Sequence, residues 1–201
     1  MINKPRYKTA RRLGNNIFDK TQGQKFALRE AQKKSDKKSR PKSDFGLSML
    51  EKQKAKVTYG VNERMFAKIV KGILEKSSVN SGDRLIAALE SRLDNVMYRL
   101  GFAPTRQSAR QMVSHGHIKV DGVRVTVPSY TVKIGNKITI REASKGKPLF
   151  SNLDEKMKAQ NIPAWLTLDA VKKEAKVQGA PKLNPTEVNF DISAVLNFYS
   201  R

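Results

Sequence analysis

The chain of 201 residues contains no cysteine, which excludes disulfide bonds and zinc sites built on thiolates. His115 and His117 are its only histidines. If both lie on one strand their rings point the same way, but two imidazoles alone make a poor ligand set, so we expect no metal and no cofactor. No run of about eighteen apolar residues occurs, and MINKPRYKTARR lacks the apolar core of a secretory signal. The sequence therefore predicts neither a membrane span nor export.

The motifs of common catalytic sites are also missing. The chain has no G-x-x-x-x-G-K-[ST] loop, no G-x-S-x-G nucleophile motif and no H-E-x-x-H zinc motif. Acidic residues occur singly, and no pair is spaced for acid–base chemistry. Aromatic residues at strand spacing, on which an RNA-recognition sheet stacks bases, are absent too. We therefore predict a protein that is not an enzyme and that does not bind single strands by stacking.

Positive charge is the property that the chain has in excess. It carries 40 Lys and Arg against 18 Asp and Glu, a formal net charge of +22. Such an excess predicts a polyanionic partner, and nucleic acid is favoured over an anionic membrane surface. Residues 1–44 are basic and poor in large apolar side chains, so we expect an arm that is disordered in the free chain. The arm's expected phosphate contacts are Arg11, Arg12, Lys38, Arg40 and Lys42.

Residues 92–140 predict the best-defined local structure, two short helices followed by a small sheet. Leu93, Val96, Met97 and Leu100 share one helical face. Gly101 is placed to end this first helix, and Thr105 is placed to cap a second one, which Gly116 ends. Asp121-Gly122 predicts a hairpin whose second strand buries its valines, and Val132 and Ile134 lead to a second turn at Gly135-Asn136.

The flanking segments are predicted to be mostly helical. Asn62 and Asp83 are candidate N-caps within a small helical bundle at 45–91. Residues 190–199 have an amphipathic pattern and need an apolar partner, for which the bundle is the obvious candidate. Residues 153–159 and 170–178 are interpreted as short helices, and Trp165 is expected to pack rather than to catalyse.

A basic face remains as the candidate site, because guanidinium and ammonium groups bind phosphate. The alternative is that each cation only solubilises its helix. In the central stretch we expect RNA contacts from Arg92, Arg99, Arg106, Arg110, Ser114, His115, His117 and Lys119. In the helical bundle we expect them from Lys52, Lys54, Lys56, Tyr59 and Arg64.

The central stretch RLDNVMYRLGFAPTRQSARQMVSHGHIKVDGVRVTVPSY resembles the RNA-binding domain named after small-subunit ribosomal protein four. Outside it, the segment SDFGLSMLEKQKAKVTYGVNERMF, the start RRLGNNIF and the end AVLNFYSR are also similar to that family. The resemblance implies binding to the five-prime domain of small-subunit rRNA, early subunit assembly, neighbouring small-subunit proteins as partners, and a place at the mRNA entrance. The N-terminal cysteines of many relatives are missing here, and KKSDKKSRPK stands where many have P-G-Q-H-G. A role of Lys38, Arg40 and Lys42 at the entrance is therefore a hypothesis.

These observations predict an α+β protein: an all-helical domain with a basic N-terminal arm, plus a small helix–helix–antiparallel-sheet RNA-binding domain. The expected boundaries are 1–44 for the arm, 45–91 with 186–201 for the helical domain, and 92–185 for the RNA-binding domain. We expect a structural, rRNA-binding constituent of a cytoplasmic or organellar ribosome. Two alternatives stay open, an RNA-modifying enzyme that uses such a domain for targeting and a free-standing RNA chaperone.

Overall fold

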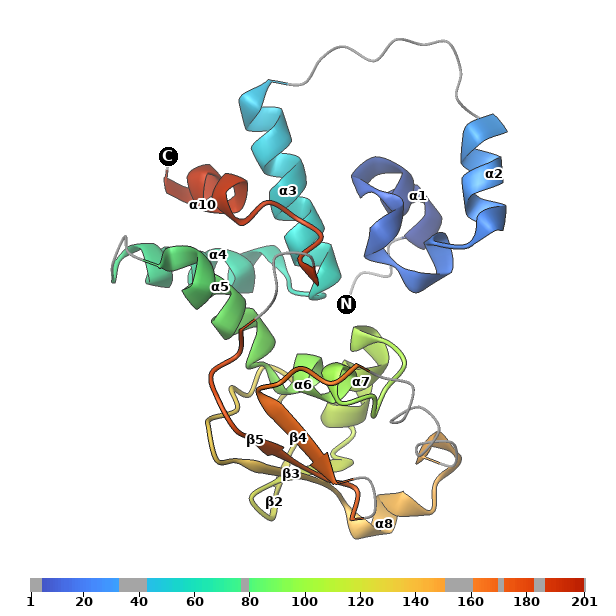
Figure 1. Ribbon diagram of the computed structural model, residues 1–201, viewed down its shortest axis with the longest axis vertical. Coiled ribbons are helices and arrows are strands. Elements are labelled where there is room, and N and C mark those ends of the chain that lie inside the picture. The colour runs from blue at the N-terminus through green and yellow to red at the C-terminus, as the bar shows by residue number, and fades with distance from the viewer. Residues whose placement is uncertain are drawn as a thin grey trace. The chain divides into compact units, whose positions relative to one another are not determined.

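The computed structural model describes residues 5–32, 43–76, 80–150, 161–169, 172–182 and 187–200. It combines helices with one antiparallel sheet, and the predicted α+β class is confirmed (Figure 1). The chain divides into two compact units, Met1–Gly82 with Asn184–Arg201 and Asp83–Leu183. The predicted domain boundaries, and the disorder of residues 1–44 in the free chain, stay predictions.

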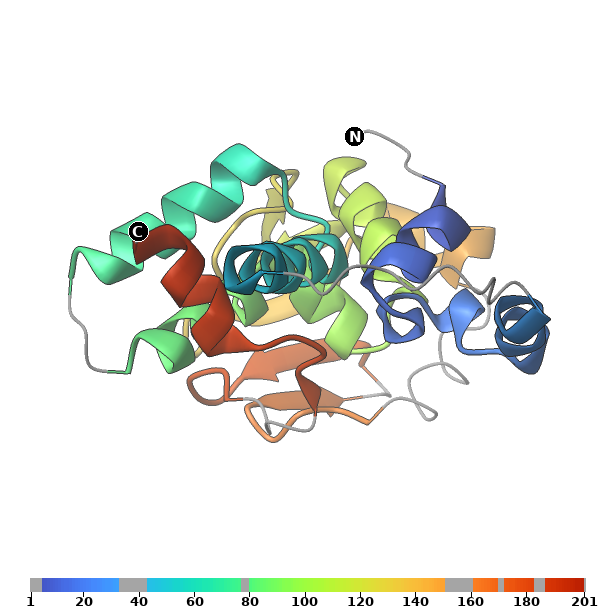
Figure 2. The same ribbon diagram turned by 90° about the horizontal axis from the view of Figure 1, so that it is seen from above.

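All the regular secondary structure described for the first unit is helical. Its elements are α1 (Arg6–Leu13), η1 (Asn15–Ile17), η2 (Asp19–Thr21), α2 (Gln24–Gln32), α3 (Asp44–Thr58), α4 (Glu63–Leu74), the start of α5 (Ser81–Glu90) and α10 (Ile192–Ser200). Asn62 caps α4 as predicted, because its side chain accepts a hydrogen bond from the Met65 N–H at 2.8 Å. Figures 1 and 2 both show α10 beside α3, where Phe198 stacks on Phe45 at 5.4 Å between ring centroids.

The second unit places two helices on one face of a five-stranded sheet. The helices are α6 (Leu93–Arg99) and α7 (Arg106–Ser114), and the strand order is β2-β1-β3-β5-β4 with every pair antiparallel. The strands are β1 (Ile118–Val120), β2 (Val123–Val125), β3 (Lys137–Ile140), β4 (Leu166–Asp169) and β5 (Glu174–Val177), and α8 (Glu142–Lys145) and η3 (Pro148–Phe150) follow β3. The apolar faces of α6 and α7 and the inward residues of four strands form one core.

The local signals of the central stretch are confirmed. The Thr105 hydroxyl accepts from the Ser108 N–H at 3.1 Å and so caps α7. Asp121 and Gly122 both have positive φ, 50° and 80°, as a two-residue type I′ hairpin turn requires. Trp165 packs in the core with 5% of its surface exposed.

The prediction of a short helix at 170–178 was wrong. Within that range Glu174–Val177 is strand β5, in which Ala175 and Val177 point into the core while Glu174 and Lys176 point out. Strand β4, its hairpin partner, was not anticipated, because Leu166–Asp169 is too short for a clear alternation signal. The predicted helix at 153–159 lies outside the described residues.

Four smaller expectations also differ from the structure. Strand β2 is an edge strand, so Val123 is 68% exposed instead of buried. Val127 lies beyond the end of β2 and is 54% exposed. Residues 132–134 form no strand, and Ile134 is exposed. Helix α5 begins at Ser81, which places Asp83 in its first turn and not at its cap. The two histidines lie between α7 and β1, not on a strand.

Candidate nucleic-acid interface

A buried carboxylate organises the arginines of the second unit. Glu90, at the end of α5, is completely buried and accepts two hydrogen bonds from Arg99 of α6, at 2.9 Å from Nε and 3.1 Å from Nη2. Its Oε2 atom also accepts from the Asn95 side chain at 2.8 Å. A buried charge is tolerated when it is paired and hydrogen-bonded in this way. Glu90 therefore fixes the Arg99 guanidinium, whose side chain remains 13% exposed, at the surface of α6.

The same network continues to α7 through Asn95. The Asn95 side-chain Oδ1 accepts a hydrogen bond from Arg106 Nε at 2.7 Å. The Arg106 guanidinium lies over the Tyr98 ring, 4.4 Å from the ring centroid. One planar side of Arg106 is therefore covered and its position is held. Such a guanidinium loses little further conformational entropy when it binds phosphate.

Arg92 has a different environment from the other predicted arginines. It is buried and makes a bidentate ion pair with Asp94, with Nη2–Oδ2 and Nε–Oδ1 distances of 2.7 and 3.1 Å. Both side chains are 4% exposed. This geometry gives Arg92 a structural role at the start of α6, and its contact with RNA stays a prediction. Arg110 of α7 approaches Asp94 more loosely, at 3.8 Å, and is about one-third exposed.

The C-terminal end of α7 presents hydroxyl and imidazole groups. Ser114 is exposed and donates its hydroxyl to the Arg110 carbonyl at 2.9 Å, and His115 is exposed at the C-cap. The His117 ring lies 6.0 Å from that of His115 and 2.9 Å from the Ser144 hydroxyl by its Nδ1 atom. These groups lie side by side between α7 and β1, and their contact with RNA stays a prediction.

His117 itself does not supply a charge to this line at neutral pH. Burial lowers its pKa below the ordinary 6.5, and the nearby positive charges of Lys147, His115, Arg141 and Arg124 lower it further. The neutral imidazole can still donate or accept a hydrogen bond. Lys119, the next cation along the chain, points from the middle of β1 to the face of the sheet opposite the core.

In the first unit, the carboxylate of Glu63 binds two of the lysines that are predicted to contact RNA. Its two carboxylate oxygens each accept one hydrogen bond from a lysine, Lys52 and Lys56, both at 2.8 Å. The Tyr199 hydroxyl of α10 donates to the same carboxylate at 2.8 Å. Burial acting alone would raise the pKa of Glu63, but these three hydrogen bonds outweigh it and lower the pKa to about 2. Burial and the Glu63 charge raise the pKa of Tyr199 in turn.

The other predicted residues of the first unit are distributed unevenly. Lys54 pairs with Glu51 one turn earlier, and Arg64 is exposed on α4. Tyr59 is 5% exposed and packs edge-on against Phe190. Arg11 and Arg12 are both exposed in the last turn of α1. Lys38, Arg40 and Lys42 lie outside the described residues.

Sequence reasoning missed the acidic residues that position these cations. In the sequence, Glu90, Glu63 and Asp94 are three of the acidic residues that occur singly. Glu90 is 9 positions from Arg99, and Glu63 is 11 positions from Lys52, so no local spacing rule identifies these pairs. Among the residues that the structure describes, no group of acidic or histidine side chains could hold a metal ion, and no helix is long and apolar enough to cross a membrane.

Comparison with known proteins assigns both parts of the chain. Residues 2–90 match the family model of the ribosomal protein S4/S9 N-terminal domain, and residues 91–138 match that of the S4 domain. The chain is 41% identical over 204 residues to the small ribosomal subunit protein uS4 of Chloroflexus aurantiacus, with 96% of each chain covered. The chain belongs to the uS4 family. The uS4 proteins of Roseiflexus sp. and Geobacillus sp. are each 40% identical to the chain over 200 residues. The Roseiflexus alignment covers 96% of each chain. The Geobacillus alignment covers 98% of this chain and 97% of the relative.

Membership in the uS4 family confirms the resemblance read from the central stretch and its flanks. The S4-domain match includes α6, α7, β1, β2 and the beginning of β3, the elements that carry the arginine network. The two family models meet at Glu90, the residue whose carboxylate joins α5 to α6.

Proposed function

We propose that the chain is a structural, non-catalytic constituent of the small ribosomal subunit that binds rRNA. The observation that carries this proposal is the arginine network of α6 and α7, in which Glu90 and Asn95 hold Arg99 and Arg106 in fixed positions. Guanidinium groups fixed in this way suit the recognition of RNA by its phosphates and shape. The bacterial uS4 relatives support a ribosome of bacterial type as the site of action.

More specifically, we infer that the RNA is the five-prime domain of small-subunit rRNA and that this binding nucleates subunit assembly. We also infer that the chain lines the mRNA entrance beside neighbouring small-subunit proteins. The proposed contacts on the second unit are Arg99, Arg106, Arg110, Ser114, His115, His117 and Lys119, with Arg92 behind them. On the first unit they are Arg11, Arg12, Lys52, Lys54, Lys56, Tyr59 and Arg64. Lys38, Arg40 and Lys42 are proposed for the entrance, and an Ala triple variant that leaves mRNA duplex unwinding there unchanged would remove that role.

The test is a filter-binding titration of the full chain against a transcript of the five-prime domain, with bulk tRNA as competitor. Salt is raised from about 50 to 200 mM, a range over which six to ten phosphate contacts cost roughly 10³–10⁵ in affinity. We expect binding to the rRNA transcript to survive tRNA competition at the higher salt. Equal affinity for the two RNAs, lost together as salt rises, would overturn the assignment and favour a general RNA chaperone.

A variant pair locates the interface within the chain. Arg106→Met removes one held guanidinium from α7, and we expect the slope of log affinity against log salt to become less steep by about 0.9, the value for one phosphate. Lys68→Met is the matched control, because Lys68 is exposed on α4 and is not among the proposed contacts. Equal slopes for both variants would exclude Arg106 from the interface.

A further inference from the structure

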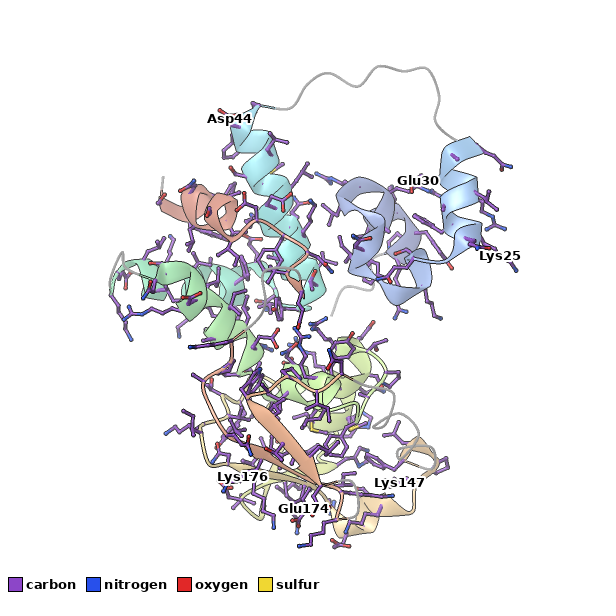
Figure 3. All side chains as sticks on the ribbon, viewed as in Figure 1. Lys25, Glu30, Asp44, Lys147, Glu174 and Lys176 are labelled. Atoms are coloured by element: carbon purple, nitrogen blue, oxygen red, sulfur yellow. The ribbon has the colours of Figure 1, made fainter. Side chains whose placement is uncertain are left out.

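The sheet of the second unit has a polar face that neither helix covers. Strand alternation places Ile118, Val120, Ile138, Ile140 and Ala175 in the core beneath α6 and α7, so their neighbours along each strand point to the opposite face. We call that opposite side the outer face. Its members are Lys119 of β1, Arg124 of β2, Lys137 and Thr139 of β3, Glu174 and Lys176 of β5, and Thr167 and Asp169 of β4. In Figure 3 the labelled Glu174 and Lys176 lie on β5, on the side of the strands away from α6 and α7.

Two pairs of like charges stand directly opposite each other on this outer face. Lys119 of β1 pairs in register with Arg124 of β2, and Lys137 of β3 pairs in register with Lys176 of β5. Like charges at directly opposed positions of an antiparallel pair destabilise a sheet. A sequence that breaks a local stability rule twice on one small surface indicates a functional demand on that surface.

In each like-charge pair, the fold gives one side chain a polar partner and leaves the other side chain without one among the described residues. Arg124 turns away, so that its Nη2 lies 3.4 Å from the His115 carbonyl, and Lys137 forms an ion pair with Glu174 at 2.6 Å. The ammonium groups of Lys119 and Lys176 make no hydrogen bond or ion pair within the part of the chain that the structure describes. The two unrelieved ammonium groups are each next to a threonine in register, Thr139 beside Lys119 and Thr167 beside Lys176.

The surroundings of Lys119 are concave and positively charged. A hollow beside Thr139 is lined by five lysines and two glutamates among the described residues, a formal excess of three positive charges. Both glutamates are already paired with lysines at its rim, Glu174 with Lys137 and Glu142 with Lys145 at 2.7 Å. An anion in the hollow would therefore meet Lys119 and the Thr139 hydroxyl without competition from a free carboxylate.

We propose that the outer face is a second RNA-binding surface, on which the Lys119 and Lys176 ammonium groups and the Thr139 hydroxyl bind the phosphodiester backbone of an RNA segment distinct from the segment bound by α7. The proposal rests on the rRNA-binding function proposed above and extends it, because the helices and the outer face lie on opposite sides of one sheet. The ligand is a phosphate backbone and not a row of bases, since the outer face has lysines and threonines but no aromatic side chain on which a base could stack.

The experiment compares two double variants of the full chain. Lys119→Met with Lys176→Met removes the two unrelieved charges and keeps most of each apolar stem. Lys133→Met with Lys182→Met removes two exposed charges from loops of the same unit and is the matched control. Each protein is titrated against the five-prime-domain transcript over the same salt series, and its complex is probed by hydroxyl-radical footprinting.

We expect the outer-face variant to bind with a salt slope that is less steep by about 1.8, the value for two lost phosphate contacts, while the control keeps the wild-type slope. Its footprint should lose protection at nucleotides that Arg106→Met leaves protected. Because the variant also removes two like-charge repulsions, its thermal midpoint without RNA should equal or exceed that of the wild type.

A salt slope equal to that of the control, or a footprint loss at the same nucleotides as Arg106→Met, would overturn the second surface. A lowered thermal midpoint in the absence of RNA would overturn the argument from charge repulsion. These failures are separate from that of the proposed function, which is decided by the wild-type chain alone through its competition between rRNA and tRNA.

Discussion

Removing the carboxylate of Asp94 should destabilise the second unit strongly. Asp94→Leu leaves the Arg92 guanidinium, with a side chain only 4% exposed, without its bidentate partner in the interior. Breaking a buried ion pair by removing one partner costs about 3–5 kcal/mol, because the remaining charge is uncompensated. The weaker Arg110 contact and the lost carboxylate in the first turn of α6 each add about 0.5 kcal/mol or less.

The double variant Arg92→Met with Asp94→Leu gives the opposite expectation. Replacing both members of a buried pair by apolar side chains of similar volume is often neutral or stabilising, so its free energy of unfolding should lie within about 1 kcal/mol of the wild type. Arg92→Met alone should cost less than Asp94→Leu, because Asp94 retains Arg110 at 3.8 Å. The two single changes are therefore strongly non-additive.

Urea unfolding followed by tryptophan fluorescence measures this cycle. Trp165 is the only tryptophan of the chain and is buried in the core of the second unit, so its emission reports the unfolding of that unit. A loss below about 1 kcal/mol for Asp94→Leu, or a double variant as unstable as the sum of the singles, would refute the reasoning. The double variant also tests Arg92 as an RNA contact, because such a contact would reduce the salt slope by about 0.9.

Four further predictions concern the same units. As pH falls from 4.5 toward about 2, the stability that Glu63 provides should be lost, because its pKa is lowered on folding; thermal melts of Glu63→Gln should lack this dependence. Tyr199→Phe should cost about 1 kcal/mol of unfolding free energy in the same melts, the value of one hydrogen bond. The lowered pKa of His117 means that folding becomes less favourable as pH falls below 6.5, and His117→Gln should weaken this trend in Trp165 fluorescence melts. Gly116→Ala should cost about 1 kcal/mol or more by urea unfolding, since Gly116 has φ +70° and its added Cβ would meet the Arg124 side chain; an unchanged midpoint would contradict it.

The parts of the fold that sequence predicted correctly are those fixed by local chemistry. The caps at Asn62 and Thr105 and the turn at Asp121-Gly122 depend on residues within three positions of each other, and all three are present. The apolar faces of α6 and α7 were predicted equally well, because their apolar residues recur at the helical period. Local rules of this kind do not depend on what the rest of the chain does.

The failures lie where pairing partners are distant in sequence. Strand β5 pairs with β3 some 35 residues earlier in the chain, and its four residues EAKV are compatible with a helix until that pairing is known. The exposure of Val123 follows from the position of β2 at the edge of the sheet, which the hairpin signal does not specify. A four-residue strand takes its identity from its neighbours in the sheet.

The same limit applies to the candidate site. Composition assigns the chain a polyanionic partner but treats Arg92, Arg99 and Lys119 as equivalent charges. The structure separates them: Arg92 is neutralised in the interior, Arg99 is paired yet reaches the surface, and Lys119 on the outer face makes no ion pair with any residue that the structure describes. An ammonium group without a partner meets an added phosphate directly, whereas the Arg99 guanidinium is already held in place by Glu90 when the phosphate arrives. Strand register places Lys119 opposite Arg124 and Lys176 opposite Lys137, and it therefore determines which cations form the proposed second surface.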